Sequence, residues 1–477
     1  MNLFRRGERV GRADLTFAPC AERTLGESSL ITNKKYPSTV IAFGCAMIVW
    51  TTFLLLAPNA FADGPFPRLG GVLYGSPHDY WDASYQAQIA RVNLAVLAVY
   101  PGWGTGHGAS MEDVVRAIKA RNPKTMVFLY VLAESLTYPP SAAWKDLAAK
   151  VDKESWWLYT HGSGPEKVLS DFGHNTYVLN ITRFTPPDES GYTFNQWFAH
   201  WVVTQFVLGT PSIDGLYTDN VFWTPRRDGD WNRDGRIDSH SDGQVRTWYR
   251  EGYRQYVDTL RQLMPGKYQI GNIADWGIDE AAYPEYQGML NGGVLEAMIG
   301  MPYSVETWGG WRKMMSWYRK AAAALAPPKL AVFHQVGDPA DYQAFRYGFA
   351  SCLMDDAYFT FSDQSVGYHG VPWFDEYDVQ LGNALDSPPS APWISGVYRR
   401  DFDRGIVLVN PKGNGSRDVT LEAGFTTIKG SQDPAVNSGK TVRTVHLKDR
   451  DGIILLLRAG QRPPHVPRGI SLDPNKP

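Results

Sequence analysis

Residues 213–220 read Ile-Asp-Gly-Leu-Tyr-Thr-Asp-Asn, an apolar run that closes on the acidic residue Asp219. A second run, Gly-Gly-Val-Leu-Glu at residues 292–296, closes on Glu296. Such strand-like runs alternate with helical patterns from residue 68 to 362, which predicts parallel strands joined by crossover helices. Eight strands are expected, the number that closes a barrel. They are residues 70–74, 94–100, 125–132, 215–219, 269–273, 293–296, 330–334 and 358–362, with helices at 111–121, 244–263, 311–325 and 342–354.

The C-terminal part of the chain changes character after a proline-rich link. Pro388, Pro389 and Pro392 precede short alternating strands and turns without a helical pattern, which is typical of a small antiparallel sandwich. The predicted fold class is therefore α/β, a (β/α)8 TIM barrel followed by a small C-terminal all-β sandwich. The expected divisions are a leader at 1–62, the barrel at 63–390, the sandwich at 391–458 and a disordered proline-rich tail at 459–477.

The first 62 residues have the features of an export signal. Two lysines precede an apolar run at residues 40–57, and Ala-Phe-Ala at residues 60–62 is a small-x-small cleavage sequence. Cleavage would start the mature protein near Asp63 and leave no membrane association. The alternative is a single membrane anchor, because the apolar run approaches spanning length. Either outcome exports the barrel, so a periplasmic or extracellular location in a bacterium is expected.

Composition and charge narrow the classes of function. Trp, Tyr and Phe make up 13% of the 477 residues, and surplus aromatic rings suit the apolar faces of sugars. The net charge of −2 offers no basic surface for nucleic acid. Two of the three cysteines lie in the leader, so Cys352 has no disulfide partner within the mature chain.

Asp219 and Glu296 are the candidate catalytic residues. They end the fourth and sixth predicted strands, so both side chains are expected at the carboxyl-terminal face of the barrel, where barrel enzymes carry their active sites. Strands two apart permit a separation of about 5–9 Å, which covers both nucleophile plus acid/base and base plus acid chemistry on a glycosidic bond. The alternative is that one or both residues cap helices or form salt bridges.

The same two segments carry a family resemblance. Residues 214–219 resemble the Asp-Gly-aliphatic-aromatic-x-Asp segment of the endo-alpha-1,4-polygalactosaminidase-like hydrolases, and residues 292–296 are similar to their later strand ending in Glu. More broadly, residues 68–410 resemble the bacterial hypothetical glycosyl hydrolase barrels grouped with that superfamily. The resemblance implies a glycoside hydrolase in which Asp219 is the nucleophile and Glu296 the acid/base, hence a retaining mechanism. The rest of the chain departs from the galactosaminidases, so no particular sugar is implied.

Further residues near predicted strand ends are candidates for substrate binding. Carboxylates and amides recognise sugar hydroxyls, and tryptophans offer stacking faces. The alternative for each residue is loop packing or helix capping, and two of the acids, Glu134 and Asp275, are also the main rivals for a catalytic role. The candidates are Tyr74, Asp79, Trp103, Glu134, Asn272, Asp275, Trp276, Trp308, His334 and Asp363.

A calcium-binding pattern follows the fourth strand. Counted from Asp230, oxygen-bearing groups fall at positions 1, 3, 5, 7 and 9 of a loop of EF-hand or dockerin type, with glycine at position 6. Ser241 stands where a bidentate acid is expected, and an acidic turn without a ligand is the alternative. A structural Ca²⁺ is expected beside Asp219, and no organic cofactor. The ligands would be Asp230, Asn232, Asp234, the carbonyl of Arg236 and Asp238.

Two functions from different classes fit these observations. The leading hypothesis is a secreted glycoside hydrolase that cleaves glycosidic bonds in an extracellular polysaccharide by a two-carboxylate mechanism. The alternative is a non-catalytic polysaccharide-binding or scaffold barrel that keeps aromatic subsites. The two hypotheses differ in whether Asp219 and Glu296 face each other across an open cleft. A polysaccharide or oligosaccharide is the expected partner in both.

Overall fold

The computed structural model describes residues 64–74, 79–98, 109–141, 144–160, 166–173, 175–278, 283–458 and 460–461. Among these residues, no helix combines the length and the hydropathy that a membrane span requires. The predicted leader lies outside the described residues, and so does nearly all of the predicted tail.

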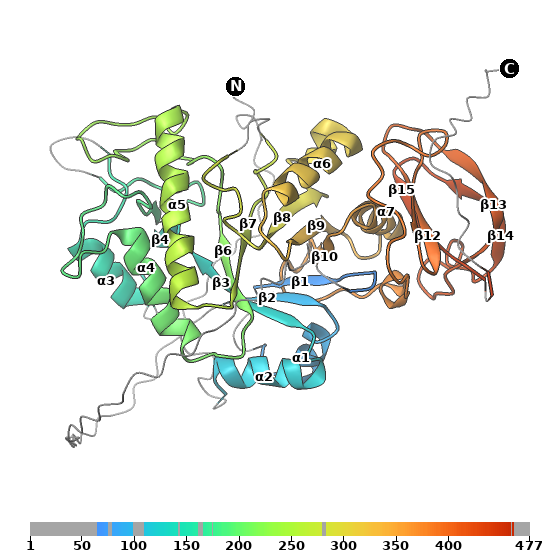
Figure 1. The fold of residues 1–477 in the computed structure, drawn as a ribbon, viewed down its shortest axis with the longest axis horizontal. Helices are drawn as coiled ribbons and strands as arrows, with labels where there is room; N and C mark the ends of the chain where they lie inside the picture. Colours follow the sequence, from blue (N-terminus) through green and yellow to red (C-terminus); the bar gives the residue numbers. More distant parts are fainter. Residues whose placement is uncertain are drawn as a thin grey trace, which may run out of the picture. The chain divides into compact units, whose positions relative to one another are not determined.

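Eight parallel strands form a nearly closed barrel in the order of the chain (Figure 1), which confirms the predicted fold class. The last strand returns to the first, because Phe359 pairs with Leu69 and its N–H donates to the carbonyl of Arg68 at 2.9 Å. All eight predicted strands are present, with ends that differ by a few residues. They are β1 (Gly70–Leu73), β2 (Leu94–Leu97), β3 (Met126–Leu132), β6 (Gly215–Asp219), β7 (Tyr268–Asn272), β8 (Gly292–Ile299), β9 (Leu330–Gly337) and β10 (Tyr358–Asp363).

The strands are buried on both faces, as in other parallel barrels. One set of alternate side chains fills the barrel interior, including Val96, Phe128, Val294 and Val332. The opposite set packs with the surrounding helices in the larger hydrophobic core. Because both faces are dry, a polar side chain on these strands requires a specific partner or access to one end of the barrel.

Helices alternate with the strands except between β7 and β8, where the described residues of the connection form only turns. Helix α2 begins with a capping box in which Ser110 and Asp113 bind each other's backbone N–H, and α5 begins at the N-cap Asp242. Helix α6 starts six residues before its predicted start at residue 311. Gly310, at φ +76, forms a kink within this helix, and the predicted start coincides with the kink. The helices are α1 (Ala83–Ile89), α2 (Met111–Arg121), α3 (Lys145–Lys153), α4 (Phe194–Val202), α5 (Gly243–Leu263), α6 (Val305–Ala323) and α7 (Tyr342–Leu353), with a π-helical turn at Val203–Val207 and a 3-10 turn at Asp375–Asp378.

The connection between β3 and β6 is long and has its own structure. It contains the short strand β5 (Thr176–Val178), which pairs antiparallel with β4 (Ser135–Thr137) in a separate two-stranded sheet outside the barrel. Helix α4 from the same connection packs against α5 (Figure 1), with the rings of Phe198 and Tyr256 stacked at 5.7 Å.

The C-terminal strands form one five-stranded antiparallel sheet rather than the two separate sheets of a sandwich. Strand β13 pairs with β14 on both sides of an irregularity between Thr420 and Phe425, and only its end, Thr426 and Thr427, pairs with β15 as well. The sheet can therefore curl and enclose its own apolar core. The strands are β11 (Tyr398–Phe402), which the sequence pattern did not predict, β12 (Gly405–Asn410), β13 (Arg417–Thr427), β14 (Thr441–Leu447) and β15 (Asp451–Leu456).

The sheet packs directly on the barrel through α7, which lies against β12 and β15 (Figure 1). Arg346 of α7 is 5% exposed and pairs with Asp433 at 2.5 Å and with Asp451 at 3.5 Å. Buried Glu306 accepts from Arg450 at 3.2 Å. Removing one partner of such a pair leaves a buried charge uncompensated, so these contacts fix the sheet to the barrel.

Candidate active site

Asp219 and Glu296 are the two positions at which solvent reaches their strands. In β6 the residues from Gly215 to Thr218 are buried and Asp219 is partly exposed; in β8 every residue is buried except Glu296. Asp219 ends β6, and Glu296 lies on β8, two strands further round the sheet. Both carboxylates therefore open from the carboxyl ends of the strands, where barrel enzymes build their active sites.

A single amide joins the two carboxylates. The Nδ2 of Asn272, at the end of the intervening strand β7, donates to Asp219 Oδ1 at 3.1 Å and to Glu296 Oε2 at 2.8 Å. Since an amide nitrogen carries two hydrogens, one serves each carboxylate. Asn272 was expected to bind substrate, and the structure places it between the two candidate catalytic groups.

Tyrosine hydroxyls donate to the other oxygen of each carboxylate, and one tyrosine shares Asp219 Oδ1 with Asn272. Tyr130 donates to Asp219 Oδ2 at 2.8 Å, Tyr217 donates to Asp219 Oδ1 at 3.4 Å, and Tyr368 donates to Glu296 Oε1. The predicted substrate residue Tyr74 joins this group through its ring, 4.6 Å from that of Tyr130. Burial and the nearby carboxylates raise the pKa of Tyr217 and of Tyr368 well above the ordinary value, so these hydroxyls stay protonated and donate.

The electrostatics of Asp219 differ from those of an exposed aspartate. Burial is the main cause that raises its pKa to about 6, and the negative charge of Glu296 acts in the same direction. The hydrogen bonds from Tyr130, Asn272 and the N–H of Asn220 oppose this shift because they stabilise the charged form. Asp219 is therefore ionised at neutral pH and takes up a proton in mildly acidic solution.

The backbone changes direction immediately after each carboxylate. Asn220 adopts φ +54 and Ala297 adopts φ +50, a left-handed conformation that non-glycine residues rarely take. Such conformations persist only where surrounding contacts impose them, and they concentrate at functional sites. The main chain at both positions is held in place: Tyr253 donates to the carbonyl of Asn220 at 3.1 Å, and the N–H of Ala297 donates to His334 Nδ1 at 3.1 Å.

Two further acids lie beside the pair. Glu134 accepts from the amide of Asn220 at 2.9 Å, and Asp275 accepts from the N–H of Trp223 at 3.2 Å. Burial raises the pKa of each carboxyl to about 7, against the opposing positive charge of Arg226. Neither has a hydrogen bond to Asn272, the amide that joins Asp219 and Glu296, among the contacts of the described residues.

The structure separates the other predicted substrate residues into two groups. Trp276 and His334 are 2% and 0% exposed, and a sugar ring has no access to them: Trp276 donates to the carbonyl of Val221 and stacks on Tyr286. Trp308 is 50% exposed on α6 and donates to the carbonyl of Tyr303 at 3.2 Å.

Two aspartates from the predicted list lie in turns, and one tryptophan is not described. Asp363 accepts from the N–H and hydroxyl of Ser365 in the turn after β10. Asp79 lies 3.9 Å from His369 in a surface depression of about 430 Å³ that Trp81 also lines. Trp103 lies outside the described residues.

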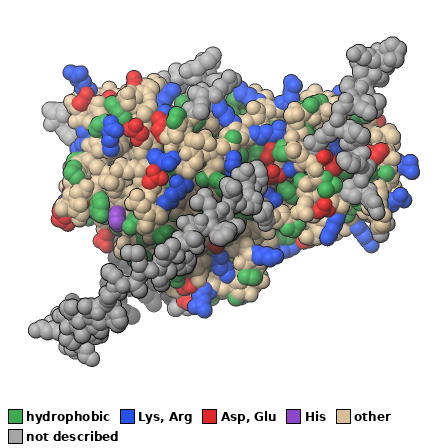
Figure 2. All heavy atoms as spheres, in the orientation of Figure 1, with side chains coloured by type: hydrophobic (Ala, Val, Ile, Leu, Met, Phe, Trp, Pro, Cys, Tyr) green, Lys and Arg blue, Asp and Glu red, His purple; other side chains and the backbone are tan. Residues whose placement is uncertain are grey.

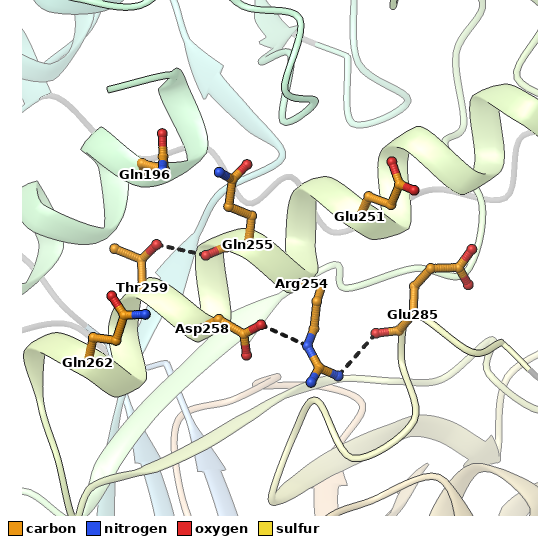
Figure 3. Close-up of a pocket in the computed structure, with 8 residues that line it drawn as sticks. All are labelled: Gln196, Glu251, Arg254, Gln255, Asp258, Thr259, Gln262 and Glu285. Atoms are coloured by element: carbon orange, nitrogen blue, oxygen red, sulfur yellow. Dashed lines mark hydrogen bonds and ion pairs between the residues drawn. The ribbon is translucent and has the colours of Figure 1, made fainter. Parts of the chain in front are cut away.

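A second depression of about 430 Å³ lies along α4 and α5 (Figure 3), and neither carboxylate of the pair is among its lining residues. It is lined by polar side chains of α4 and α5, among them Gln196, Arg254 and Asp258, together with Glu285. The face of the molecule in Figure 2 carries positive and negative side chains interspersed, in keeping with the small net charge.

The predicted calcium loop is closed at its base by two backbone hydrogen bonds between Gly229 and Asp238. The carboxylate of Asp230 accepts from the N–H groups of Asp234 and Gly235, both at 3.0 Å. Gly235 has φ +85, which explains glycine at this position.

The loop departs from a complete calcium site in two respects. Asp242, the acid nearest the last ligand position, instead caps α5 by accepting from the N–H groups of Gln244 and Val245. No three His, Cys, Asp or Glu side chains in the described part of the chain are grouped closely enough to hold a metal ion. Burial, together with the charges of Asp234 and Asp230, raises the pKa of Asp238, so a cation would relieve repulsion within the loop.

Three tyrosines that donate to the carboxylate pair were missed by the sequence analysis. Tyr217 lies two residues before Asp219 on the same face of β6, so period-two spacing was an available signal. Tyr130 lies opposite Tyr217 in the β3–β6 register, which becomes visible only once the strands are paired. Tyr368 lies in the segment after β10 and has no sequence signal of this kind.

An eight-stranded parallel barrel with two partly exposed carboxylates, one at the end of β6 and one within β8, has the arrangement of a glycoside-hydrolase-like barrel. Residues 119–406 match the model of hypothetical glycosyl hydrolase family 15. This match covers more than half of the chain, so the protein belongs to that family and is a glycoside hydrolase. The family resemblance noted in the sequence is confirmed.

Solved structures with a similar arrangement are distant. An alpha-galactosidase variant from Geobacillus stearothermophilus is 13% identical with a TM-score of 0.41, covering 84% of this chain and 57% of its own. The glycoside hydrolase domain of PelA from Pseudomonas aeruginosa is 13% identical with a TM-score of 0.37, and the alignment covers 65% of this chain and 99% of the PelA domain. Amy13B from Eubacterium rectale is 10% identical with a TM-score of 0.46, and the alignment covers 82% of this chain and 95% of Amy13B. No curated protein matches the chain.

Proposed function

We propose that this protein is an exported hydrolase that cleaves a polysaccharide with retention of configuration, with Asp219 as nucleophile and Glu296 as acid/base. The observation that carries the proposal is the shared amide of Asn272, which keeps an oxygen of each carboxylate within about 6 Å of the other. Retaining enzymes hold their carboxyl groups about 5–5.5 Å apart, whereas inverting enzymes leave about 6.5–9.5 Å for a water molecule. The family match supports hydrolysis of glycosidic bonds but assigns no sugar.

The proposed reaction has two steps. In the first, Asp219 attacks the anomeric carbon, the bond to the leaving oxygen breaks, and Glu296 transfers its proton to that oxygen. In the second, Glu296 removes a proton from water, the water oxygen attacks the anomeric carbon, and Asp219 leaves as a carboxylate. Tyr130 and Asn272 fix the orientation of Asp219 through both steps, because each donates to a different oxygen.

Export is proposed from the leader alone. The apolar run at residues 40–57 and the Ala-Phe-Ala sequence at residues 60–62 support cleavage before Asp63. N-terminal sequencing of the protein recovered outside the cytoplasm should find Asp63 or a neighbouring residue. An intact chain that remains in the membrane fraction would support the anchor alternative.

Calcium is proposed as a structural ion of the loop after β6. The side chains of Asp230, Asn232, Asp234 and Asp238 and the carbonyl of Arg236 would hold it. When bound, it would neutralise the loop and order the segment that follows Asp219. The spacing and the Gly235 conformation support this proposal, whereas the use of Asp242 as a helix cap leaves the last ligand position without an acid.

A substrate panel tests the proposed activity directly. The mature protein is incubated with amino-sugar and neutral polysaccharides, and new reducing ends are measured beside the double variant Asp219→Asn/Glu296→Gln. Hydrolysis by the wild type alone supports the proposal, and NMR of the first product reports whether the anomeric configuration is retained. Binding without hydrolysis across the panel would favour the non-catalytic barrel.

A further inference from the structure

The strand that carries Glu296 is irregular at this residue. Strand β8 pairs regularly with β9 as far as Leu295, which lies opposite Phe333, but the next pair joins Ile299 to Gln335. Four steps along β8 therefore match two steps along β9, so β8 has extra residues directly after Leu295. Ala297 within this bulge has φ +50. The far end requires glycine, because a Cβ at Gly300 would lie 1.7 Å from the carbonyl oxygen of Val336.

His334 of the neighbouring strand holds the bulge from inside the barrel. The N–H of Ala297 donates to its Nδ1 at 3.1 Å, while its Nε2 lies 2.9 Å from the hydroxyl of Ser362. Because Nδ1 accepts, the ring proton is on Nε2 and points to Ser362. The ring is fully buried, and this burial lowers its pKa to about 3, so Nδ1 remains an acceptor at neutral and mildly acidic pH.

The carbonyl of Ala297 is held as well. The hydroxyl of Ser304, just before α6, donates to it at 2.6 Å. Both polar groups of this residue are thus satisfied by side chains in place of the regular ladder of a parallel sheet. A bulge held at both groups can fix the direction of the preceding side chain, which is Glu296.

His334 also contacts the residue that binds the Glu296 carboxylate. Its ring centroid lies 5.9 Å from that of Tyr368, whose hydroxyl donates to Glu296 Oε1. The imidazole therefore touches both the backbone that follows Glu296 and the tyrosine that holds its carboxylate. No sugar can reach the ring, so a role in substrate contact does not explain a histidine here.

We infer that His334 is a positioning residue: its Nδ1 keeps the β8 bulge in the form that aims Glu296 at the leaving oxygen. The inference rests on the proposed role of Glu296 as acid/base. A small displacement of a proton donor lowers the rate of the step that needs the proton, while binding of the substrate is little changed.

Two variants of similar size separate the contacts of the ring. In His334→Asn the side-chain oxygen can take the place of Nδ1 and accept from Ala297, whereas in His334→Gln the amide reaches the place of Nε2 and the Ala297 contact is lost. We expect His334→Gln to lose about 100-fold in kcat on the polysaccharide with KM nearly unchanged. His334→Asn should keep most of the activity.

The leaving group provides a readout that a purely structural role would not move. An aryl glycoside with a dinitrophenolate leaving group needs no proton donor, so formation of the glycosyl-enzyme from it, measured as the initial burst of phenolate, should be nearly normal in His334→Gln. Equal losses on both substrates, or equal losses in the Asn and Gln variants, would overturn the inference. Leu421→Ala, in the core of the C-terminal sheet, is the control for a general loss of stability, because it should lower the melting temperature without touching the site. It should not lower the rate on the polysaccharide more than the rate on the aryl glycoside.

Two further variants are needed. One tests the inference if His334→Gln does not fold, and the other distinguishes failure of the inference from failure of the proposed function. If His334→Gln does not fold, Ser304→Ala removes the other hold on Ala297 and should show the same dependence on leaving group, more weakly; its absence would contradict the inference. Glu296→Gln is assayed in parallel. Full activity of that variant would overturn the proposed function, whereas its loss together with normal His334 variants would overturn the positioning role alone.

Discussion

The carboxylate pair and the calcium-like loop are both acidic, and Asp219 precedes the loop by only 11 residues, yet the two clusters are built differently. Loop carboxylates accept from backbone N–H groups no more than 7 residues away. Asp219 and Glu296 are instead held by side chains of other elements, chiefly Tyr130, Asn272 and Tyr368. A local cluster is encoded by spacing alone, whereas the pair exists only when the barrel has closed.

The two clusters also differ in what their burial does. Asp219 is partly enclosed at the end of a barrel, where burial and a second carboxylate raise its pKa to about 6. Most of the loop around Asp230 and Asp234 is open to solvent, so its charges cost the fold less. The pair should therefore control activity and the loop should control stability, and each of the following predictions tests that division.

The largest expected effect is on turnover. Asp219→Asn and Glu296→Gln keep the size of the side chain but remove the charge or the proton, and each should lower kcat about 1000-fold or more. Azide should restore activity on an activated substrate in Glu296→Gln and not in Asp219→Asn. Asp230→Ala is the matched control, because it removes a loop carboxylate and should retain activity. Near-normal rates in either pair variant would move the assignment to Glu134 or Asp275.

A smaller effect is expected on the pH profile. Because Asp219 must be ionised to attack, kcat/KM should fall as the pH drops through about 6. Tyr130→Phe removes a hydrogen bond that favours the charged form, so the acid limb should move to higher pH and the rate at pH 6 should fall about 10-fold. Tyr177→Phe, on β5 outside the barrel, is the control and should leave the limb in place. If the acid limb does not move in Tyr130→Phe, the limb does not report the ionisation of Asp219.

Calcium removal should act on stability. Chelation should lower the melting temperature of the wild type by about 3–5 °C, because a bound ion stabilises only the folded state. Asp230→Ala/Asp234→Ala should have the lower melting temperature already and should not respond to chelator, while Asp219→Asn should respond as the wild type does. An unchanged wild-type melting temperature, with no metal found in the purified protein, would establish the acidic turn without a ligand.

The smallest expected effect is a gain in stability. The folded-state pKa of Asp219 lies above its ordinary value of 3.8, so the folded protein binds this proton more tightly and loses stability as the pH rises from about 4 to about 6. Asp219→Asn has no such charge and should melt about 1–3 °C above the wild type at pH 8, with little difference at pH 4. A lower melting temperature at pH 8 would mean that the lost hydrogen bonds outweigh the removed charge.

The sequence by itself determined the order of the eight barrel strands and placed Asp219 and Glu296 on the fourth and sixth of them, although β8 continues three residues beyond Glu296. Strand patterns are local, and the parallel strands of a barrel present their carboxyl ends at one face. Both acids must therefore lie at that face. The Gly235 position was equally readable, because a turn at φ +85 requires glycine whatever surrounds it. The curled C-terminal sheet was less readable, since β11 and the irregularity in β13 depend on pairing with distant strands.

Only the tertiary structure decided how the two acids are held. Asn272 was recognised as polar and near a strand end, but its place between the carboxylates follows from the stagger of β6, β7 and β8. A histidine near a strand end can bind a sugar, and His334 was predicted to do so. Its full burial and its bond from the N–H of Ala297 show that it binds the backbone instead. A residue type limits which bonds a side chain can form, and the three-dimensional packing selects which of those bonds it makes.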